Sequence, residues 1–264
     1  MVDATFDPSV EFNAHTGPEI GEIARRGGIV VVPVASTEQH GPALPVSTDS
    51  SLVTAVAKGA ASRLAGEVEV LVTPTMAFGA SHHHMDLGGT ISLTVETFQR
   101  VIIDIAETLH RDGFRKILVL NGHGGNMAPL GAAAATLAME RGIHVAATSY
   151  WTLIAHRISE VRESEIGGMA HAGEFETSLQ LYLNEVEVRA DKIRSTKPND
   201  PSRYFTIDLF GSSRVIYPRT MPEVTGSAGN IGEAKLATKQ KGERLFAMCV
   251  EEVAAFLEDF NTWG

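Results

Sequence analysis

Residues 28–42 read GIVVVPVASTEQHGP, an apolar run that leads directly into a turn rich in polar side chains. The run 28–34 is short, continuous and rich in β-branched residues, which is typical of a strand covered on both faces in a parallel sheet. Outward from this stretch, strand-like and helix-like patterns alternate, which predicts a layered α/β fold with one domain over 1–264 as the simplest arrangement. Further strands are expected at 68–72, 116–120 and 144–148, helices at 50–64, 94–111, 129–140, 174–183 and 234–260, and loops with short strands at 195–232.

The composition and charge of the chain argue against several classes of protein. The 264 residues carry a formal net charge of −10 and no dense Lys or Arg run, which argues against a nucleic-acid or anionic-membrane surface. No apolar stretch reaches the roughly 18 residues of a membrane span. The first residues lack the basic and apolar regions of a signal peptide, so a cytoplasmic location is expected. The single cysteine, Cys249, excludes an internal disulfide and a cysteine-rich zinc site, and its context predicts a buried helix position.

Three separated clusters combine carboxylates with imidazoles, the ligands that borderline divalent metals prefer. Glu38 and His40 follow the first strand two positions apart, so in an extended segment both project to the same side, and Asp49 can return to the same centre. The second cluster is 121–126, with sequence NGHGGN, and the third is 171–176, with sequence HAGEFE. A carboxylate can bridge two metals that activate a shared water molecule, so the clusters predict one metal centre assembled in three dimensions.

Each cluster taken alone also has a structural interpretation. The first is compatible with a turn followed by a helix cap. The glycines and asparagines of 121–126 are typical of a tight turn. Acidic residues in 171–176 are favoured electrostatically at a helix start. The prediction of a metal centre fails only if the structural interpretation is correct for all three clusters at once.

Other candidates concern the substrate. Residues 81–86 contain three consecutive histidines, but adjacent side chains diverge and rarely converge on one ion. At least two of them are therefore expected to be pocket wall or surface, with His84 as the candidate for substrate contact. Tyr150 and Trp151 follow the fourth expected strand, where they either line a pocket or pack in the core. No serine lies in a nucleophile elbow, which disfavours a covalent mechanism.

Taken together, the motifs resemble those of the creatininase (creatinine amidohydrolase) family. The resemblance implies a three-layer α/β/α sandwich with a mostly parallel central sheet, usually assembled as a homohexamer. It also implies two divalent metal ions, Zn²⁺ first and Mn²⁺ or Fe²⁺ as alternatives. The matching stretches are 34–42, 44–49, 89–93, 121–126, 171–178 and 237–242.

The resemblance also assigns roles to residues. Glu38, His40 and Asp49 match metal ligands, with Asp49 bridging the two ions. His123 matches a further ligand. His171 matches the histidine proposed to donate a proton to the leaving nitrogen.

One departure from the family pattern concerns the second metal. Creatininase proper has a metal-binding glutamate two residues after the position of His123, whereas this chain has Gly125. Glu176 is the predicted replacement ligand, and Glu174 is the reserve ligand and a candidate catalytic proton carrier beside His171. The departure leaves open whether one or two metals bind, and it argues against creatinine itself as substrate. The glycine form is shared with formamidopyrimidine deformylases and with the peptidase that trims the mycofactocin precursor.

The sequence therefore predicts a metal-dependent hydrolase of a C–N bond in a small cyclic or formylated amide, acting through a metal-activated bridging water. Its partners are expected to be a small-molecule amide and further copies of the chain. One alternative is a peptidase acting on a short peptide. Another is a non-catalytic ligand-binding relative that has kept the fold.

Overall fold

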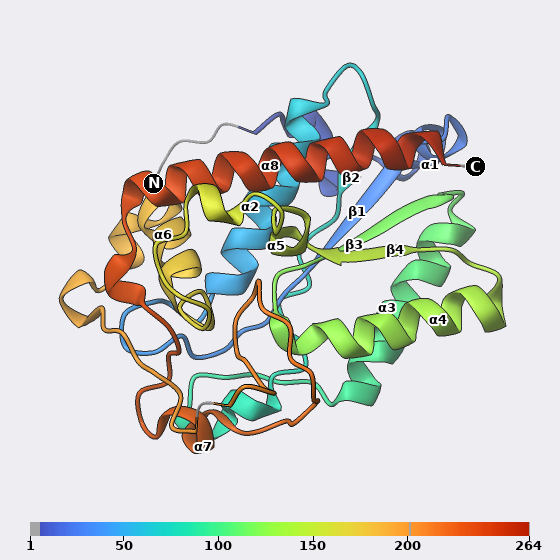
Figure 1. Cartoon of the computed structure of the whole chain (residues 1–264). Coiled ribbons are helices and arrows are strands. Elements are labelled where there is room, and N and C mark those ends of the chain that lie inside the picture. Colours follow the sequence, from blue (N-terminus) through green and yellow to red (C-terminus); the bar gives the residue numbers. More distant parts are fainter. Residues whose placement is uncertain (1–5, 201, 264) are drawn as a thin grey trace.

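The computed structural model of the protein describes residues 6–200 and 202–263, which form a parallel four-stranded sheet flanked by helices (Figure 1). The strand order is β2-β1-β3-β4, and Ile29 of β1 lies opposite Val70 on one side and Lys116 on the other. Leu118 of β3 lies opposite Ala146 of β4. The strands are β1 (Ile29–Val34), β2 (Val70–Val72), β3 (Lys116–Asn121) and β4 (Ala146–Ser149).

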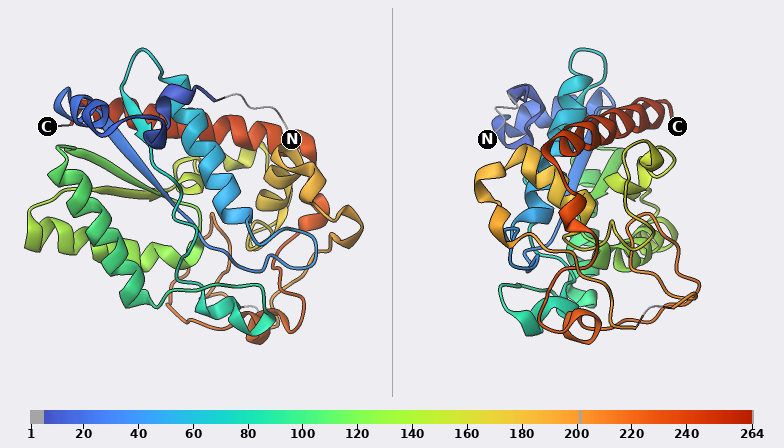
Figure 2. Two further views of the ribbon diagram at one scale, coloured as in Figure 1. Left: turned by 180° about the vertical axis from the view of Figure 1, so that it is seen from behind. Right: turned by 60° about the vertical axis from the view of Figure 1, so that its left-hand side comes forward.

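Helices cover both faces of this sheet, because successive side chains of a strand point to opposite sides. Ile29 and Val31 pack with α2, α6 and α8, whereas Val30 and Val32 pack with α1, α3 and α4. In Figure 1, α8 runs along one side of the sheet and α3 and α4 lie on the other; Figure 2 shows the same arrangement from behind. The helices are α1 (Gly17–Arg25), α2 (Thr48–Arg63), α3 (Val95–Arg111), α4 (Met127–Arg141), α5 (Tyr150–Leu153), α6 (Glu174–Leu183), α7 (Met221–Thr225) and α8 (Lys239–Thr262).

Strand β1 contains a proline although it lies in the middle of the sheet. The backbone of Pro33 faces the β2 side, where its carbonyl accepts from the amide of Met76. Because β2 has already ended at Val72, no ladder hydrogen bond is lost through the missing N–H. The proline is therefore tolerated in an interior strand.

Helices α6 and α8 pack closely against each other. A Cβ at Gly242 would collide with the backbone carbonyl of Ser178, so this position of α8 requires glycine. Cys249 is buried on the same helix, which confirms its predicted setting. The close approach fixes α6, and hence the residues of its first turn, relative to the rest of the fold.

Differences from the predicted elements are confined to their ends and to weak patterns. Strands β2 and β4 each begin two residues later than expected. Within 195–232 the structure has the short helix α7 and isolated bridges instead of strands. Helix α1 was not predicted, although Thr16 and Glu19 form a capping box at its start. The 3₁₀ helices are Pro8–Val10, Phe12–Ala14, His82–Leu87, Gly124–Asn126, Ile158–Glu160, Glu185–Glu187, Ala190–Lys192 and Ala234–Leu236.

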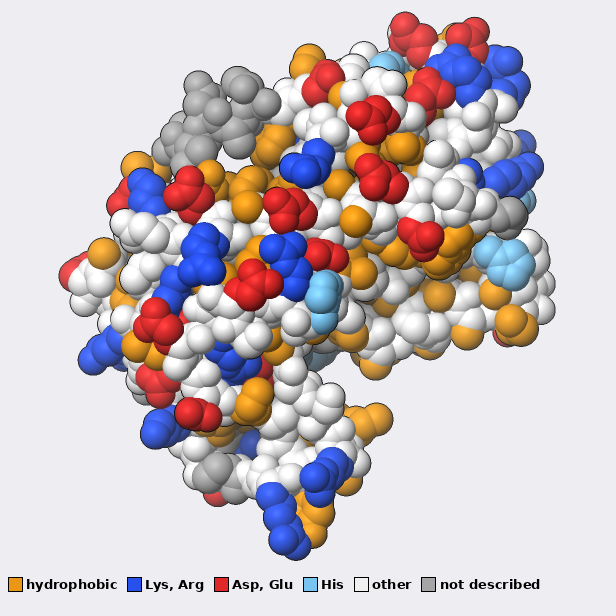
Figure 3. Space-filling model, turned by 45° about the horizontal axis from the view of Figure 1, so that its top comes forward, with side chains coloured by type: hydrophobic (Ala, Val, Ile, Leu, Met, Phe, Trp, Pro, Cys, Tyr) orange, Lys and Arg blue, Asp and Glu red, His pale blue; other side chains and the backbone are white. Residues whose placement is uncertain are grey.

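The surface shows no segregation of charge on the face drawn in Figure 3, where Lys and Arg are interspersed with Asp and Glu. Within the described ranges, none of the helices combines the length and the apolarity needed to cross a lipid bilayer.

Candidate metal centre

The predicted ligands gather at the carboxyl ends of the two central strands. Helix α2, which follows β1 in the chain, covers one face of the sheet, whereas α3 and α4 cover the other face. Such a reversal beside β1 creates a crevice at the strand ends, the usual ligand site of open α/β sheets. Glu38 and His40 follow β1, and His123 follows β3.

Glu38, Asp49 and His123 form the first group of potential ligands. Nδ1 of His123 lies 3.1 Å from Glu38 Oε2 and 3.2 Å from Asp49 Oδ2. All three side chains are buried. Asp49 reaches the group from the first turn of α2, where an acidic residue is also favoured by the helix dipole.

His40, Asp49 and Glu176 form the second group. Nε2 of His40 lies 3.0 Å from Asp49 Oδ1 and 3.9 Å from Glu176 Oε2. Glu176 is held by the backbone amide of Ala172, which donates to Oε2 at 2.6 Å. Ala172 has a φ of 50°, so the turn before α6 adopts the left-handed conformation to aim this amide at the carboxylate. Asp49 belongs to both groups, with a different oxygen facing each.

The unpaired polar atoms of the two groups fit divalent cations. Among the described residues, four buried atoms of the cluster lack a hydrogen-bond partner: Glu38 Oε1, Glu38 Oε2, His40 Nε2 and Asp49 Oδ2. A buried polar atom left unsatisfied costs about 1–3 kcal/mol. In each group the potential ligand atoms lie within 4.8 Å of one another. Carboxylate oxygens and imidazole nitrogens suit Zn²⁺ and similar ions, so a cation would satisfy atoms that the protein leaves without a partner.

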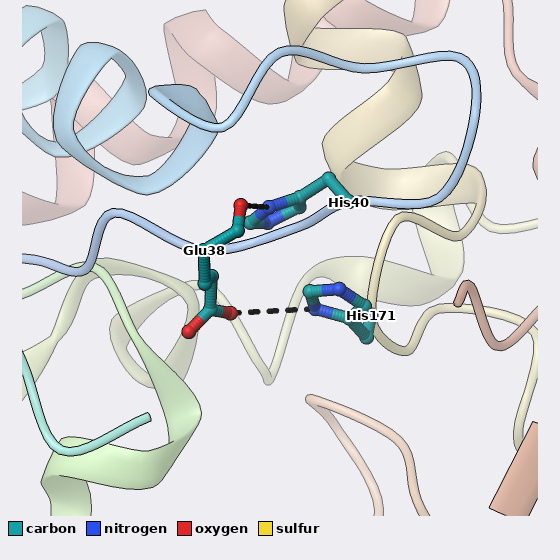
Figure 4. Close-up of side chains that lie close together, drawn as sticks. All are labelled: Glu38, His40 and His171. Atoms are coloured by element: carbon teal, nitrogen blue, oxygen red, sulfur yellow. Dashed lines mark hydrogen bonds and ion pairs between the residues drawn. The ribbon is translucent and has the colours of Figure 1, made fainter. Parts of the chain in front are cut away.

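His171 lies beside both groups, as the close-up of Glu38, His40 and His171 shows (Figure 4). Its Nδ1 is 3.6 Å from Glu38 Oε1, and its ring centroid is 4.2 Å from that of His40. The same residues form a third set with ligand atoms close together. The structure thus brings together Glu38, His40, Asp49, His123 and Glu176, the first-choice ligands predicted from the sequence, with His171 at their edge.

The three consecutive histidines diverge, as expected for adjacent residues. His82 is exposed and its Nδ1 lies 3.0 Å from Ser92 Oγ, whereas His84 is buried with Nε2 3.3 Å from Glu38 Oε1. His83 stacks on His123 at a centroid distance of 5.6 Å. His84 is therefore the member of the triplet that faces the potential ligands.

Protons and cations compete for this buried cluster. Burial lowers the pKa of His40, but Asp49, Glu176 and Glu38 outweigh this and raise it to about 9. Burial raises the pKa of Glu176 to about 7, with Asp49 and Glu38 adding to the shift and His40 opposing it. Burial also lowers the pKa of His84 to about 2, despite the attraction of Glu38. His40 therefore holds a proton at neutral pH when no cation is bound, and Glu176 is protonated in part of the molecules.

Gly125 marks the departure from the creatininase pattern. A Cβ at this position would collide with Nε2 of His123 and with the carbonyl oxygen of Ala80. Even alanine is therefore too large without local movement. The third ligand atom of the second group comes instead from Glu176 on α6.

Glu174 lies outside the candidate metal centre, which corrects its prediction as a reserve ligand and proton carrier. Its carboxylate is buried and accepts from Lys241 Nζ at 2.7 Å. The backbone amides of Glu163 and Ser164 donate to it at 3.1 and 3.0 Å. Burial raises the pKa of Glu174, but these hydrogen bonds outweigh it and lower the pKa. The carboxylate is thus a structural anchor between α6 and α8.

Tyr150 and Trp151 lie in the core between the sheet and α8, so the packing alternative describes them better than contact with substrate. Tyr150 is fully buried and stacks on Phe175 at a centroid distance of 6.0 Å. Trp151 is 3% exposed and meets Tyr150 edge-on at 5.1 Å.

Sequence reasoning missed the residues that orient the ligands. Ser81 Oγ lies 3.1 Å from Nε2 of His123, on the side of the ring opposite the carboxylates. Asn126 accepts from the amide of Ala80 and donates to the carbonyl of Ala35, which joins the loops after β2 and β1. Such partners of a ligand are usual around metals. Asn126 stood inside a predicted cluster, but only the fold reveals what it binds.

Comparison with known proteins identifies the family. The profile described as "Creatininase: Creatinine amidohydrolase" matches residues 13–257, most of the chain. The chain belongs to the creatininase family. This membership confirms the predicted three-layer fold and the prediction of a metal-dependent amidohydrolase acting on C–N bonds other than ordinary peptide bonds.

Individual members of the creatininase family resemble the chain over nearly its whole length. The mycofactocin precursor peptide peptidase of Mycobacterium tuberculosis is 30% identical over 245 residues, covering 86% of this chain and 85% of that protein. The creatinine amidohydrolase of Pseudomonas putida is 29% identical over 248 residues, covering 88% of this chain and 90% of that enzyme. A solved creatininase mutant of the Zn–Zn type superposes with a TM-score of 0.81 at 28% identity, covering 96% of this chain and 99% of that chain. The zinc form of this neighbour supports divalent metal binding within the fold.

Proposed function

We propose that this member of the family uses two divalent cations to hydrolyse the C–N bond of a small cyclic or formylated amide. The observation that carries the proposal is the pair of buried ligand groups that share Asp49. Glu38 and His123 complete the first group, and His40 and Glu176 complete the second. A shared carboxylate is the arrangement expected where two ions lie close together.

The bound ions, His171 and His84 have separate roles in the proposed reaction. When bound, the two ions supply Lewis-acid chemistry that polarises a carbonyl group and lowers the pKa of a water molecule. His171 lies next to Glu38 and carries the proton to the leaving nitrogen, as a general acid must. His84 faces the same carboxylate and contacts the substrate.

Our proposals for the metal, the oligomeric assembly and the cellular location rest on the family resemblance and on the sequence. Zn²⁺ is the first choice of metal because the donors are carboxylates and imidazoles, with Mn²⁺ and Fe²⁺ as alternatives. A homohexamer in the cytoplasm is the assembly we propose. Creatinine is disfavoured as substrate because Gly125 replaces the glutamate of creatininase proper and its surroundings leave no room for a side chain.

A second candidate function is cleavage of a short peptide. The similarity to a mycofactocin precursor peptide peptidase supports it. Large apolar side chains at the carboxyl-end side of the sheet are also exposed: Phe78 by 45%, Ile91 by 55% and Met127 by 47%. Such side chains suit an apolar peptide as well as a small amide. A non-catalytic binding protein is the remaining alternative, and it has no use for a carboxylate shared by two cations.

The test combines metal content with hydrolysis. Protein purified without chelator is expected to hold two Zn, Mn or Fe ions per chain by elemental mass spectrometry. It should hydrolyse a member of a panel of cyclic amides, formamides and short peptides. Asp49→Ala should lose both properties, whereas Asp104→Ala on the exposed side of α3 should keep both. An Asp49→Ala protein with full turnover would refute the proposal, and a metal-bound protein inert toward the whole panel would favour the binding protein.

A further inference from the structure

The side chain of Gln39 lies between two histidines of the site and is not itself a potential metal ligand. Its Oε1 accepts from the backbone N–H of Gly41 at 3.0 Å. Its Nε2 lies 2.9 Å from the carbonyl oxygen of Gly229. Because an amide oxygen only accepts and an amide nitrogen only donates, these two backbone groups fix which end of the amide points where.

The fixed amide determines the tautomer of His84. Nε2 of Gln39 lies 2.8 Å from Nδ1 of His84. One hydrogen of the amide nitrogen is used by Gly229, so the other points at this ring nitrogen. Nδ1 of His84 must accept it and therefore carries no proton. The proton of the ring is on Nε2, which lies 3.3 Å from Glu38 Oε1.

The backbone of the same residue determines the tautomer of His171. Nε2 of His171 lies 2.7 Å from the carbonyl oxygen of Gln39, which only accepts. Nε2 therefore carries the proton, and Nδ1, 3.6 Å from Glu38 Oε1, keeps its lone pair. The 3.3 Å contact between the amide nitrogen of Gln39 and Nε2 of His171 joins two donors. It is not a hydrogen bond, because both amide hydrogens are already used.

We infer that Gln39 is a positioning residue that holds His84 and His171 both as the Nε2–H tautomer but turned in opposite directions, so that the N–H of His84 and the Nδ1 lone pair of His171 face the metal centre side by side. The two rings lie 4.3 Å apart between centroids. A flipped ring of His84 would put carbon atoms opposite both Gln39 and Glu38, so both polar contacts depend on the observed orientation.

The chemical consequence rests on the proposed function. The N–H of His84 is a hydrogen-bond donor for the carbonyl oxygen of an amide, on which negative charge develops during attack. The lone pair of His171 accepts a proton, which the same ring then delivers to the leaving nitrogen. If each ring carried its proton on Nδ1 instead, His84 would present a lone pair and His171 an N–H to the centre, although every ligand of the metals would be unchanged.

The tautomers are measured directly by ¹⁵N–¹H correlation NMR of zinc-loaded protein labelled at histidine; zinc is suitable because it is a d¹⁰ ion. Single His84→Asn and His171→Asn variants assign the signals. In the wild type we expect His84 protonated at Nε2 only, and His171 also protonated at Nε2. In Gln39→Glu the carboxylate accepts, so the proton of His84 should move to Nδ1 while His171 is unchanged. Gln240→Glu, the same chemical change on the exposed surface of α8, should leave both rings as in the wild type.

Activity and metal content provide the second readout. Gln39→Glu should keep its zinc and lose about 10- to 100-fold in kcat, the usual effect of changing a partner of a site residue. If Gln39→Glu does not fold, Gln39→Met serves, and His84 should then show both tautomers. Nδ1–H on His84 in the wild type, or a His84 tautomer that does not respond to either variant, would overturn the inference. A wild type that hydrolyses no amide overturns the proposed function but leaves the tautomer result in place.

Discussion

Replacing Lys241 by methionine is expected to destabilise the protein strongly, because it leaves a buried carboxylate without its counter-charge. Nζ of Lys241 donates to Glu174 Oε1 at 2.7 Å and to the carbonyl oxygen of Leu236 at 2.6 Å. Lys241 is 7% exposed and Glu174 is fully buried. Methionine preserves most of the packing volume of the aliphatic chain but provides no donor. Removing one partner of a buried ion pair costs about 3–5 kcal/mol.

The expected shift in melting temperature follows from the length of the chain. An unfolding entropy of about 2.1 cal/mol/K per residue over 264 residues gives about 0.55 kcal/mol/K. A loss of 3–5 kcal/mol then lowers Tm by about 5–9 °C. Differential scanning calorimetry at a fixed free zinc concentration measures this shift, because bound metal itself contributes to stability.

A neighbouring lysine on the same helix is the control. Lys239 pairs with Glu185, and both side chains are about half exposed, so Lys239→Met should cost less than about 1 kcal/mol. Adding Glu174→Gln to Lys241→Met should recover part of the loss, because a neutral amide needs no counter-charge. Equal effects of Lys241→Met and Lys239→Met, or no recovery in the double variant, would refute the reasoning.

Two further predictions concern the metal centre. Gly125→Ala should lower metal content and stability, because its Cβ would meet the ring of His123, whereas Gly124→Ala, whose Cβ meets nothing within 4 Å, should behave as the wild type in elemental analysis and calorimetry. Zinc affinity should fall as pH is lowered. A bound ion displaces the proton of His40 below a pKa of about 9 and that of Glu176 below about 7, so calorimetric titrations in buffers of different ionisation enthalpy should show proton release. An affinity that is constant from pH 9 to pH 6 would contradict this.

The fold was predictable where burial is continuous. Strand β1 is apolar at every position because both of its faces are covered, and this pattern is readable without neighbours. The ends of β2 and β4 were less predictable, because a strand ends where pairing ends, and pairing is a property of the sheet. Helix α1 is short, and its local signals are few: the capping box of Thr16 and Glu19, Pro18 in its first turn and Arg25 in its last.

The assembly of the candidate site was predictable to the level of clusters but not of individual side chains. Glu174 and Glu176 lie two residues apart on α6, so their side chains point about 200° apart around the helix. The sequence contains this separation but not the rotation of the helix, which its packing on α8 sets. For the same reason Tyr150 and Trp151 were ambiguous, since the residue after a strand enters either the core or a pocket. Metal ligation by Glu176 stays a prediction.

The carboxylate of Asp49 faces both ligand groups, and these groups draw on segments that are far apart in the chain. From Glu38 to Glu176 the chain advances 138 positions, through α2, β2, α3, β3, α4, β4 and α5 to α6. Ions held between these segments would act as cross-links that close very long loops, and closing a loop restricts the unfolded chain more when the loop is longer. Zinc in this protein would then stabilise the folded chain in addition to supporting catalysis. Its removal should make the segment between β4 and α6 more susceptible to proteases, in addition to abolishing hydrolysis.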